Sequence, residues 1–259
     1  MKHVFFDIDG TLWDFMSVIP DSAVSAIKQL QANGHKAYIS TGRTRGYITK
    51  PNLLSIGFDG ILSGCGTRLE KGEDVIYEYL IPREKATAAV DLVRSHGFRA
   101  ILEGPEFLYM DYEDFKDDVY GKKVMRDLGD HLRSLSDNYG DWVISKFSCD
   151  MSGCDKEACY TELRKDFDVI EHNDIIAEMV PKGFNKGTGI KKFCELINID
   201  IADTIAIGDG ANDLDMFEAA GFSVAMGSGA EIAKNAADHI TTGLKEDGIY
   251  NALKHLDLI

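Results

Sequence analysis

The chain has 259 residues, which exceeds the usual size of one domain, so we expect one large α/β unit or a core with a second, smaller domain. A composition of 44% hydrophobic and 27% charged residues excludes a disordered or fibrous protein. The formal net charge of −15 disfavours nucleic acids and anionic membrane surfaces as partners. An anionic substrate would need a locally positive pocket, formed by a metal ion, a lysine or helix N-termini.

Cysteine usage and apolar patterning predict a cytoplasmic protein. The five cysteines are odd in number and form no C-x-x-C pair, which favours reduced thiols. Cys149, Cys154 and Cys159 could form a metal site, but they lack close ligand pairs and a fourth partner, so we interpret them as buried thiols. The first apolar run reaches Asp7 too early for a signal peptide, and no apolar stretch is long enough to span a membrane.

The first and last parts of the chain show the alternation of strands and helices that is typical of a parallel sheet. Near the N-terminus a buried strand, an amphipathic helix and a second strand follow one another, which is a β-α-β unit. The C-terminal part repeats this pattern, so both parts are predicted to build one Rossmann-like α/β core. The predicted strands are 3–6, 36–40, 204–207 and 223–225, and the predicted helices are 22–33, 186–197 and 214–220.

The middle of the chain has a different pattern and predicts an inserted α+β domain. Its expected helices are 83–96 and 156–166, and its expected strands are 99–102, 107–110, 142–147, 168–170 and 176–180. Pro82 and Pro181 mark its borders. We therefore expect a core formed by residues 1–81 and 182–259, with residues 82–181 as the inserted domain.

Two acidic residues follow the first strand, in the segment DIDGTL. Asp7 and Asp9 lie two positions apart, so their side chains point into one crevice at the carboxyl end of the strand, where open α/β sheets bind ligands. One carboxylate could attack phosphorus while the other gives and takes a proton, and such carboxylates also suit a Mg²⁺ site. A turn rich in Asp and Gly, without chemistry, is the alternative.

Thr41, Gly42 and Lys186 could contact a phosphate group. The Thr41 hydroxyl and the Gly42 amide could hold phosphate oxygens at a helix N-terminus, although Thr is also an ordinary N-cap. Lys186 begins a helix within GFNKGTGI, and a cation there would neutralise a carboxylate nucleophile and its incoming phosphate. The glycines on either side would let the backbone approach a ligand. A solvated surface lysine is the alternative, and Lys182 is a nearby competitor.

A further acidic group follows the predicted strand at 204–207, in the segment GDGAND. Asp209 lies at the strand end, and Asn212 and Asp213 lie in the loop before a helix. A third carboxylate here would complete an oxygen-rich magnesium site. The same residue types are also common at helix starts, where an acid such as Asp213 complements the helix dipole.

Four segments of the chain together resemble the four motifs of haloacid dehalogenase phosphatases, specifically the Cof-type subfamily with an α/β cap of class IIB. They are DIDGTL, Thr41 in STGR, Lys186 in NKG, and GDGAND. The motifs occur in the family's order and span nearly the whole chain. The resemblance implies a phosphatase in which Asp7 is the nucleophile and Asp9 is the general acid and base. It also implies that Thr41 and Gly42 bind the transferring phosphoryl group. Lys186 would position this group against Asp7.

The same resemblance implies Mg²⁺ as the cofactor, bound by the Asp7 carboxylate, the Asp9 backbone carbonyl and the Asp209 carboxylate. Asn212 would contact phosphate or its surroundings, and Asp213 would support the lysine or the metal shell. The inserted domain would be a cap that closes over the core and selects the substrate. That substrate would be a small phosphorylated metabolite, with sugar phosphates as the leading class and phosphorylated cofactors behind them.

One departure from the subfamily concerns Cys65, in the segment LSGCGTRL. The subfamily usually has Asn followed by Gly here, so a polar contact of the family's site is absent from this chain. Because the acid pair already supplies a nucleophile, we do not expect the thiol to be catalytic.

Other functions would use part of this site. A phosphomutase would share the acids and the metal but would return the phosphoryl group to a reoriented sugar. A dehalogenase needs no second acid for a leaving alcohol, so Asp9 argues against it, and a P-type ion pump needs membrane spans. A metabolite sensor on the same fold would need neither two acids nor a metal. We therefore predict a Mg²⁺-dependent phosphatase that hydrolyses phosphomonoesters through a phosphoaspartate.

Overall fold

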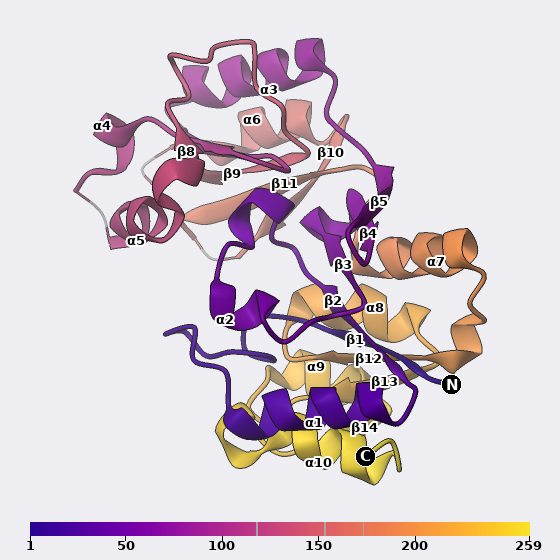
Figure 1. Ribbon diagram of the computed structural model, residues 1–259. Helices are drawn as coiled ribbons and strands as arrows, with labels where there is room; N and C mark the ends of the chain where they lie inside the picture. The colour runs from indigo at the N-terminus through magenta and orange to yellow at the C-terminus, as the bar shows by residue number, and fades with distance from the viewer. Residues whose placement is uncertain (118, 153, 173) are drawn as a thin grey trace. The chain divides into compact units, whose positions relative to one another are not determined.

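Two compact units make up the chain in the computed structural model, which describes residues 1–117, 119–152, 154–172 and 174–259 (Figure 1). Unit 1 comprises Met1–Gly42, Lys50–Glu78 and Asn185–Ile259. Unit 2 comprises Arg43–Thr49 and Tyr79–Phe184. Each unit has its own sheet and its own buried hydrophobic core.

An eight-stranded sheet forms the centre of unit 1. Its strands are β1 His3–Phe6, β2 Lys36–Ser40, β3 Gly60–Ser63, β4 Arg68–Lys71, β5 Asp74–Glu78, β12 Thr204–Gly208, β13 Phe222–Ala225 and β14 His239–Ile240. Their order is β14-β13-β12-β1-β2-β3-β4-β5. The strands from β14 to β3 pair in parallel, whereas β4 pairs antiparallel with both β3 and β5. Strand β1 is buried along its whole length, as its apolar sequence predicts for a central strand.

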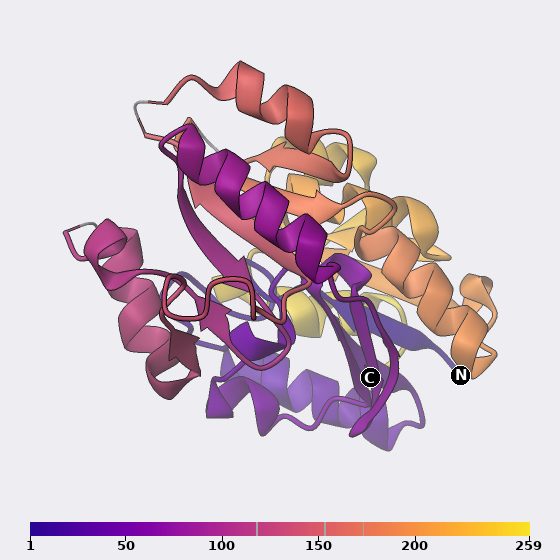
Figure 2. The same cartoon turned by 90° about the horizontal axis from the view of Figure 1, so that it is seen from above.

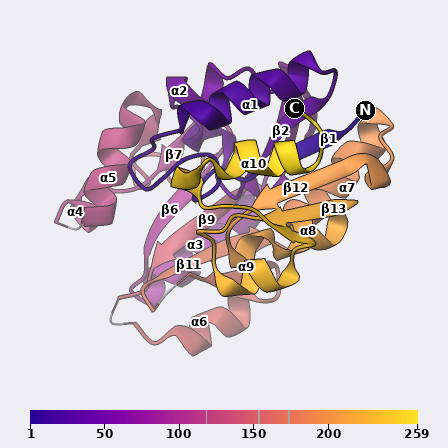
Figure 3. The same ribbon diagram turned by 90° about the horizontal axis from the view of Figure 1, so that it is seen from below.

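Helices cover both faces of this sheet. They are α1 Asp21–Ala32, α2 Pro51–Leu54, α7 Lys186–Ile197, α8 Leu214–Ala219, α9 Glu231–Ala236 and α10 Gly248–His255. Apolar side chains of α7, α8 and α9 pack on one face against Phe5, Tyr38 and Leu62. On the other face α1 and α10 lie side by side (Figure 3). Short 3-10 turns span Gly64–Gly66, Ile201–Asp203, Ala211–Asp213 and Leu244–Glu246.

Unit 2 is built on a six-stranded mixed sheet. Its strands are β6 Arg99–Glu103, β7 Leu108–Tyr109, β8 Leu132–Arg133, β9 Lys146–Asp150, β10 Phe167–Glu171 and β11 Ile176–Pro181, in the order β10-β11-β9-β6-β7-β8. Its helices are α3 Arg83–Ser95, α4 Tyr112–Phe115, α5 Val119–Leu128 and α6 Lys156–Leu163, with 3-10 turns at Arg45–Tyr47 and Gly129–His131. Helices α3 and α6 pack on one face, over Phe147 and Met179 (Figure 2).

The predicted fold class is confirmed: a mainly parallel α/β core is combined with a second domain on a mixed sheet. One strand was placed too early, because the predicted strand 142–147 is β9, Lys146–Asp150. Trp142 lies instead in a loop, where its indole N–H donates to the Leu135 carbonyl oxygen at 2.9 Å. Its burial therefore comes from packing and not from strand pairing. Helices α4 and α5 were not predicted.

The cysteines are free thiols, and Cys65, Cys149, Cys159 and Cys194 are buried. Burial raises the pKa of the Cys149 thiol well above its ordinary value and that of Cys159 to about 11. The thiols of Cys149 and Cys159 are therefore protonated at neutral pH. Within the described ranges, no helix has both the length and the apolar character needed to cross a membrane.

Candidate active site

Three strands of unit 1 end at the same edge of the sheet. Strand β1 pairs in parallel with β12 on one side and with β2 on the other. Asp7 follows β1, Thr41 follows β2 and Asp209 follows β12. The pairing continues past the strand end, since the Asp7 N–H donates to the Ile207 carbonyl oxygen at 2.9 Å. The sheet therefore gathers these polar residues at its carboxyl edge, where open α/β folds bind ligands.

Lys186 connects two of the acidic residues at this edge. Its Nζ lies 2.5 Å from Asp7 Oδ1 and 2.6 Å from Asp213 Oδ1. All three side chains are buried, with relative exposures of 2% for Lys186, 4% for Asp7 and 0% for Asp213. Burial of an ammonium group requires such partners. Lys186 is thus the lysine that contacts Asp7, whereas its competitor Lys182 is exposed.

The acidic residues carry more negative charge than Lys186 offsets. Carboxylate oxygens of Asp7, Asp209 and Asp213 all lie within 4.8 Å of one another. When ionised, these three groups contribute −3 and Lys186 contributes +1, which leaves −2. Burial raises the pKa of Asp7 well above its ordinary value. For Asp209, burial is the main cause and the negative charge of Asp213 the second, and together they raise its pKa to about 6. A group of oxygen donors with this surplus charge fits a hard divalent cation.

The charge balance also affects the pKa of Lys186. Burial alone would lower its pKa, but the carboxylates of Asp213 and Asp7 outweigh burial and raise the pKa of Lys186 above its ordinary value. Lys186 therefore remains a cation at neutral pH, as a phosphate-binding role requires.

Asp213 is held differently from the other two acids. Its Oδ1 accepts from Lys186, and its Oδ2 accepts the backbone N–H groups of Asp209 and Gly210 at 2.8 and 2.9 Å. Both oxygens therefore already have donors within the protein. This geometry shapes the loop after β12 and fixes the lysine, and it distinguishes Asp213 from Asp7 and Asp209.

The start of α7 places Lys186 through a capping box. The Thr188 N–H donates to Asn185 Oδ1 at 2.7 Å, and the Asn185 N–H donates to the Thr188 hydroxyl at 2.9 Å. A Cβ atom added to Gly187 would lie 2.2 Å from the Asp215 carbonyl oxygen. Gly187 therefore allows α7 to pack closely against α8. That the glycines around Lys186 let the backbone approach a ligand stays a prediction.

Gly10 allows Asp209 to lie close to the turn after β1. Its φ is 86°, and a Cβ atom there would lie 2.2 Å from Asp209 Oδ2. The glycine of DIDG is thus needed both for the turn after β1 and for the close approach of Asp209.

The other predicted residues lie in the loops around this edge. Thr41 is buried at the end of β2, and Gly42 follows it. Asn212 is exposed within the 3-10 turn that precedes α8. Asp9 is also exposed, and its Oδ1 accepts a hydrogen bond of 2.9 Å from the indole N–H of Trp13. Trp13 is not among the residues predicted for the site, although its position four residues after Asp9, in a segment rich in Asp and Gly, was a usable signal.

Cys65 occupies a strained backbone position beside the end of β2. Its φ is 57°, and its neighbours Gly64 and Gly66 have φ values of 59° and 85°, so three consecutive residues have positive φ. The Cys65 N–H donates to the Thr41 carbonyl oxygen at 3.1 Å, which ties this turn to the predicted phosphate loop. A left-handed conformation is costly for any residue except glycine and, to a lesser degree, asparagine.

This strain gives a measurable prediction for stability. Cys65→Gly and Cys65→Ala both remove the thiol, but only glycine relieves the left-handed conformation. We expect Cys65→Gly to have the larger free energy of unfolding, by roughly 1 kcal/mol. At an ordinary position the order is reversed, since glycine is the more flexible residue when unfolded. Denaturant unfolding of both variants tests this, and an alanine variant that is equally or more stable would contradict it.

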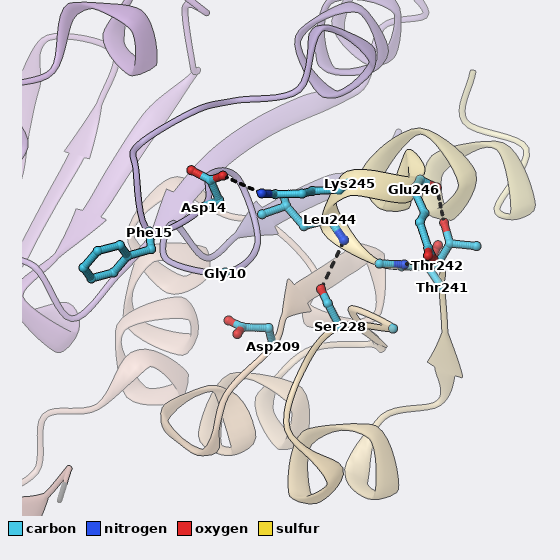
Figure 4. Close-up of a pocket in the computed structure, with 12 residues that line it drawn as sticks. Gly10, Asp14, Phe15, Asp209, Ser228, Thr241, Thr242, Leu244, Lys245 and Glu246 are labelled. Atoms are coloured by element: carbon cyan, nitrogen blue, oxygen red, sulfur yellow. Dashed lines mark hydrogen bonds and ion pairs between the residues drawn. The ribbon is translucent and has the colours of Figure 1, made fainter.

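A cavity of about 640 Å³ opens beside Asp209 (Figure 4). Gly10, Asp14 and Phe15 line it from the loop after β1, and residues 241–246 line it from the C-terminal part of unit 1. Lys245 Nζ lies 3.1 Å from Asp14 Oδ2, so an ion pair connects the two sides. Asp209 and Gly10 line the cavity and also lie at the carboxyl edge of the sheet, so the cavity adjoins this edge. Its volume is within the range of small-molecule sites.

Comparison with known proteins identifies the class. A family model of haloacid dehalogenase-like hydrolases matches residues 4–253, so this chain belongs to that family. YkrA of Bacillus subtilis (strain 168) is 31% identical, covering 100% of this chain and 98% of the relative. YitU of the same organism, a 5-amino-6-(5-phospho-D-ribitylamino)uracil phosphatase, is 28% identical, covering 97% of this chain and 96% of the relative.

Solved structures narrow the class further. The subclass IIB sugar phosphatase BT4131 superposes with a TM-score of 0.83 at 28% identity, covering 100% of both chains. A protein of Geobacillus kaustophilus HTA426 superposes with a TM-score of 0.85 at 29% identity, covering 100% of this chain and 99% of the other. The chain is a phosphoric monoester hydrolase of the Cof type, with the class IIB fold, that acts on small phosphorylated metabolites.

Proposed function

We propose that this protein is a Mg²⁺-dependent phosphatase that hydrolyses sugar phosphates through a phosphoaspartate at Asp7. The observation that carries the proposal is the buried contact of Lys186 with Asp7 and Asp213, beside Asp209. A cation held against a strand-end carboxylate can bring that carboxylate and a phosphate dianion together, which their like charges otherwise oppose.

The donor set supports Mg²⁺. Asp7 and Asp209 would hold the ion with their carboxylates, and Asp9 would contribute its backbone carbonyl. We assign Asp213 to Lys186 and the loop after β12, because both of its oxygens already accept protein hydrogen bonds. When bound, the ion would offset the negative charge of the phosphoryl oxygens and of the attacking carboxylate.

Two phosphoryl transfers would then complete the reaction. An Asp7 carboxylate oxygen attacks phosphorus, the bond between phosphorus and the ester oxygen breaks, and Asp9 gives its proton to the leaving alcohol. Water next attacks the acyl phosphate at phosphorus, Asp9 takes a proton from it, and Asp7 leaves as a carboxylate. Inorganic phosphate is released with Asp9 protonated again. Thr41, Gly42, Lys186 and Asn212 would hold the phosphoryl oxygens throughout.

The names of similar proteins support sugar-derived substrates. BT4131 is described as a sugar phosphatase, and YitU acts on a phosphorylated ribityl compound. We propose that residues 82–181 form the cap and select among such substrates, because the residues gathered at the edge of β1, β2 and β12 address only the phosphoryl group.

Phosphate release from a panel of phosphorylated metabolites tests the proposal. With Mg²⁺ present, we expect release from sugar phosphates, and we expect excess EDTA to remove it reversibly. Full turnover in EDTA would contradict the metal site, and turnover confined to other phosphate esters would contradict the sugar assignment. Formation of an isomeric sugar phosphate without free phosphate would instead identify a phosphomutase.

A further inference from the structure

The loop after β1 folds back so that a buried tryptophan meets the second acid. The N–H groups of Leu12 and Trp13 donate to the Ile8 carbonyl oxygen at 2.9 and 3.1 Å. In return, the Gly10 N–H donates to the Trp13 carbonyl oxygen at 2.9 Å. These bonds fix the backbone of Trp13 beside that of Asp9, and the two residues form an isolated β-bridge. The indole ring is 1% exposed, and its N–H donates to Asp9 Oδ1 at 2.9 Å.

We propose that Trp13 is a positioning residue that orients the Asp9 carboxyl group for proton transfer, an inference that rests on the proposed function. An indole N–H can donate but cannot accept, and the unprotonated oxygen of a carboxyl group is the better acceptor, so the indole favours an unprotonated Asp9 Oδ1. The proton of the acid form is therefore placed on Oδ2. The same oxygen then gives the proton to the leaving alcohol and takes one from water, while Oδ1 stays bound to Trp13 through both steps.

This contact matters because Asp9 itself is exposed. A solvated carboxylate on a loop can adopt several rotamers, and only some present an oxygen to the reacting group. Trp13 supplies a fixed donor, since its ring is buried and its backbone is bonded on both sides of the loop. A hydrogen bond to an ionised oxygen is also stronger than a neutral one.

The chain contains a matched control for this indole. Its two tryptophans are both buried and both donate through the indole N–H, but Trp142 donates to the Leu135 backbone carbonyl oxygen. Trp13→Phe and Trp142→Phe therefore delete the same group and shrink a buried ring in the same way. Only the first removes a donor from Asp9, so loss of packing and loss of positioning can be separated.

A double-mutant cycle in the presence of Mg²⁺ tests the inference. With an alkyl phosphate we expect Trp13→Phe to lower kcat by about tenfold while KM changes little, as expected when a hydrogen bond to a charged group is lost. Trp142→Phe should retain the wild-type kcat. Because Trp13 acts through Asp9, adding Trp13→Phe to Asp9→Asn should cause little further loss. An unchanged kcat for Trp13→Phe, or an equal loss in the Asp9→Asn background, would overturn the inference.

Two results separate the role of Trp13 from the proposed function. Full turnover by Asp9→Asn would contradict the proposed chemistry. If Asp9→Asn loses turnover but a folded Trp13→Phe does not, only the role of Trp13 is contradicted. If Trp13→Phe does not fold, the NMR signals of the two indole N–H groups in the wild type test whether Trp13 binds Asp9. Trp142→Phe assigns the two signals, and Asp9→Ala should shift that of Trp13. A signal that does not move would show that no such bond exists.

Discussion

Replacing Asp7 with asparagine is expected to lower turnover by about 10⁴- to 10⁶-fold, the range seen when a covalent nucleophile is removed. The amide is nearly isosteric but cannot attack phosphorus. It also removes a charged ligand from the proposed Mg²⁺ site. The fold should be retained, because Lys186 keeps its contact with Asp213 at 2.6 Å and the buried cation is not left alone.

Asp200→Asn is the matched control for this variant. Asp200 is exposed, and its Oδ1 accepts the Ala202 N–H at 3.0 Å, a bond that asparagine can also accept. We expect wild-type turnover from it. Phosphate release under saturating substrate and Mg²⁺, together with thermal unfolding, compares the two variants. Turnover by a folded Asp7→Asn within tenfold of the wild type would exclude Asp7 as the nucleophile.

Asp9→Asn is expected to lower turnover of alkyl phosphates by about 10²- to 10⁴-fold, the usual contribution of general acid–base catalysis. This range corresponds to roughly 3 to 5 kcal/mol in the barrier. An aryl phosphate should behave differently, since its leaving group hardly needs a proton. We expect a rapid first release of the aryl alcohol, followed by a slow phase in which water must attack without its base.

Magnesium titration separates this effect from loss of the metal. The proposed contact of Asp9 with Mg²⁺ is the backbone carbonyl, which asparagine retains, so the Mg²⁺ affinity should change little. Turnover fully restored by added Mg²⁺, or unchanged on the alkyl ester, would remove Asp9 from the acid–base role. Stopped-flow measurement of the aryl alcohol detects the two phases.

The sequence predicted those features of the edge that depend on local pattern. Asp7, Thr41 and Asp209 each follow an apolar run, so their places at strand ends could be predicted from the chain alone. Parallel pairing of β1 with β2 and β12 then brings them together. The mainly parallel core follows from the alternation of strands and helices in the first and last parts of the chain, and the inserted domain follows from the different pattern in the middle.

Other features depend on packing between distant segments and could not be predicted in this way. The motif alone could not decide between Lys186 and Lys182, which are four residues apart, because the decision comes from the burial of α7 against the sheet. The role of Trp13 depends on a loop that closes on itself through backbone hydrogen bonds. Similarly, the strand around Lys146 was misplaced, since Trp142 and Ile144 before it are buried in a loop.

The central claim is that Asp7 carries the phosphoryl group during turnover, and trapping that group tests it most directly. The wild type and Asp9→Asn are mixed with an aryl phosphate and Mg²⁺, quenched, and reduced with borohydride, which converts an aspartyl phosphate into homoserine. Peptide mass spectrometry should then find homoserine at position 7, with more of it in Asp9→Asn and none in Asp7→Asn or without substrate. Release of aryl alcohol and phosphate with no modification at position 7, or with modification at another aspartate, would contradict the account.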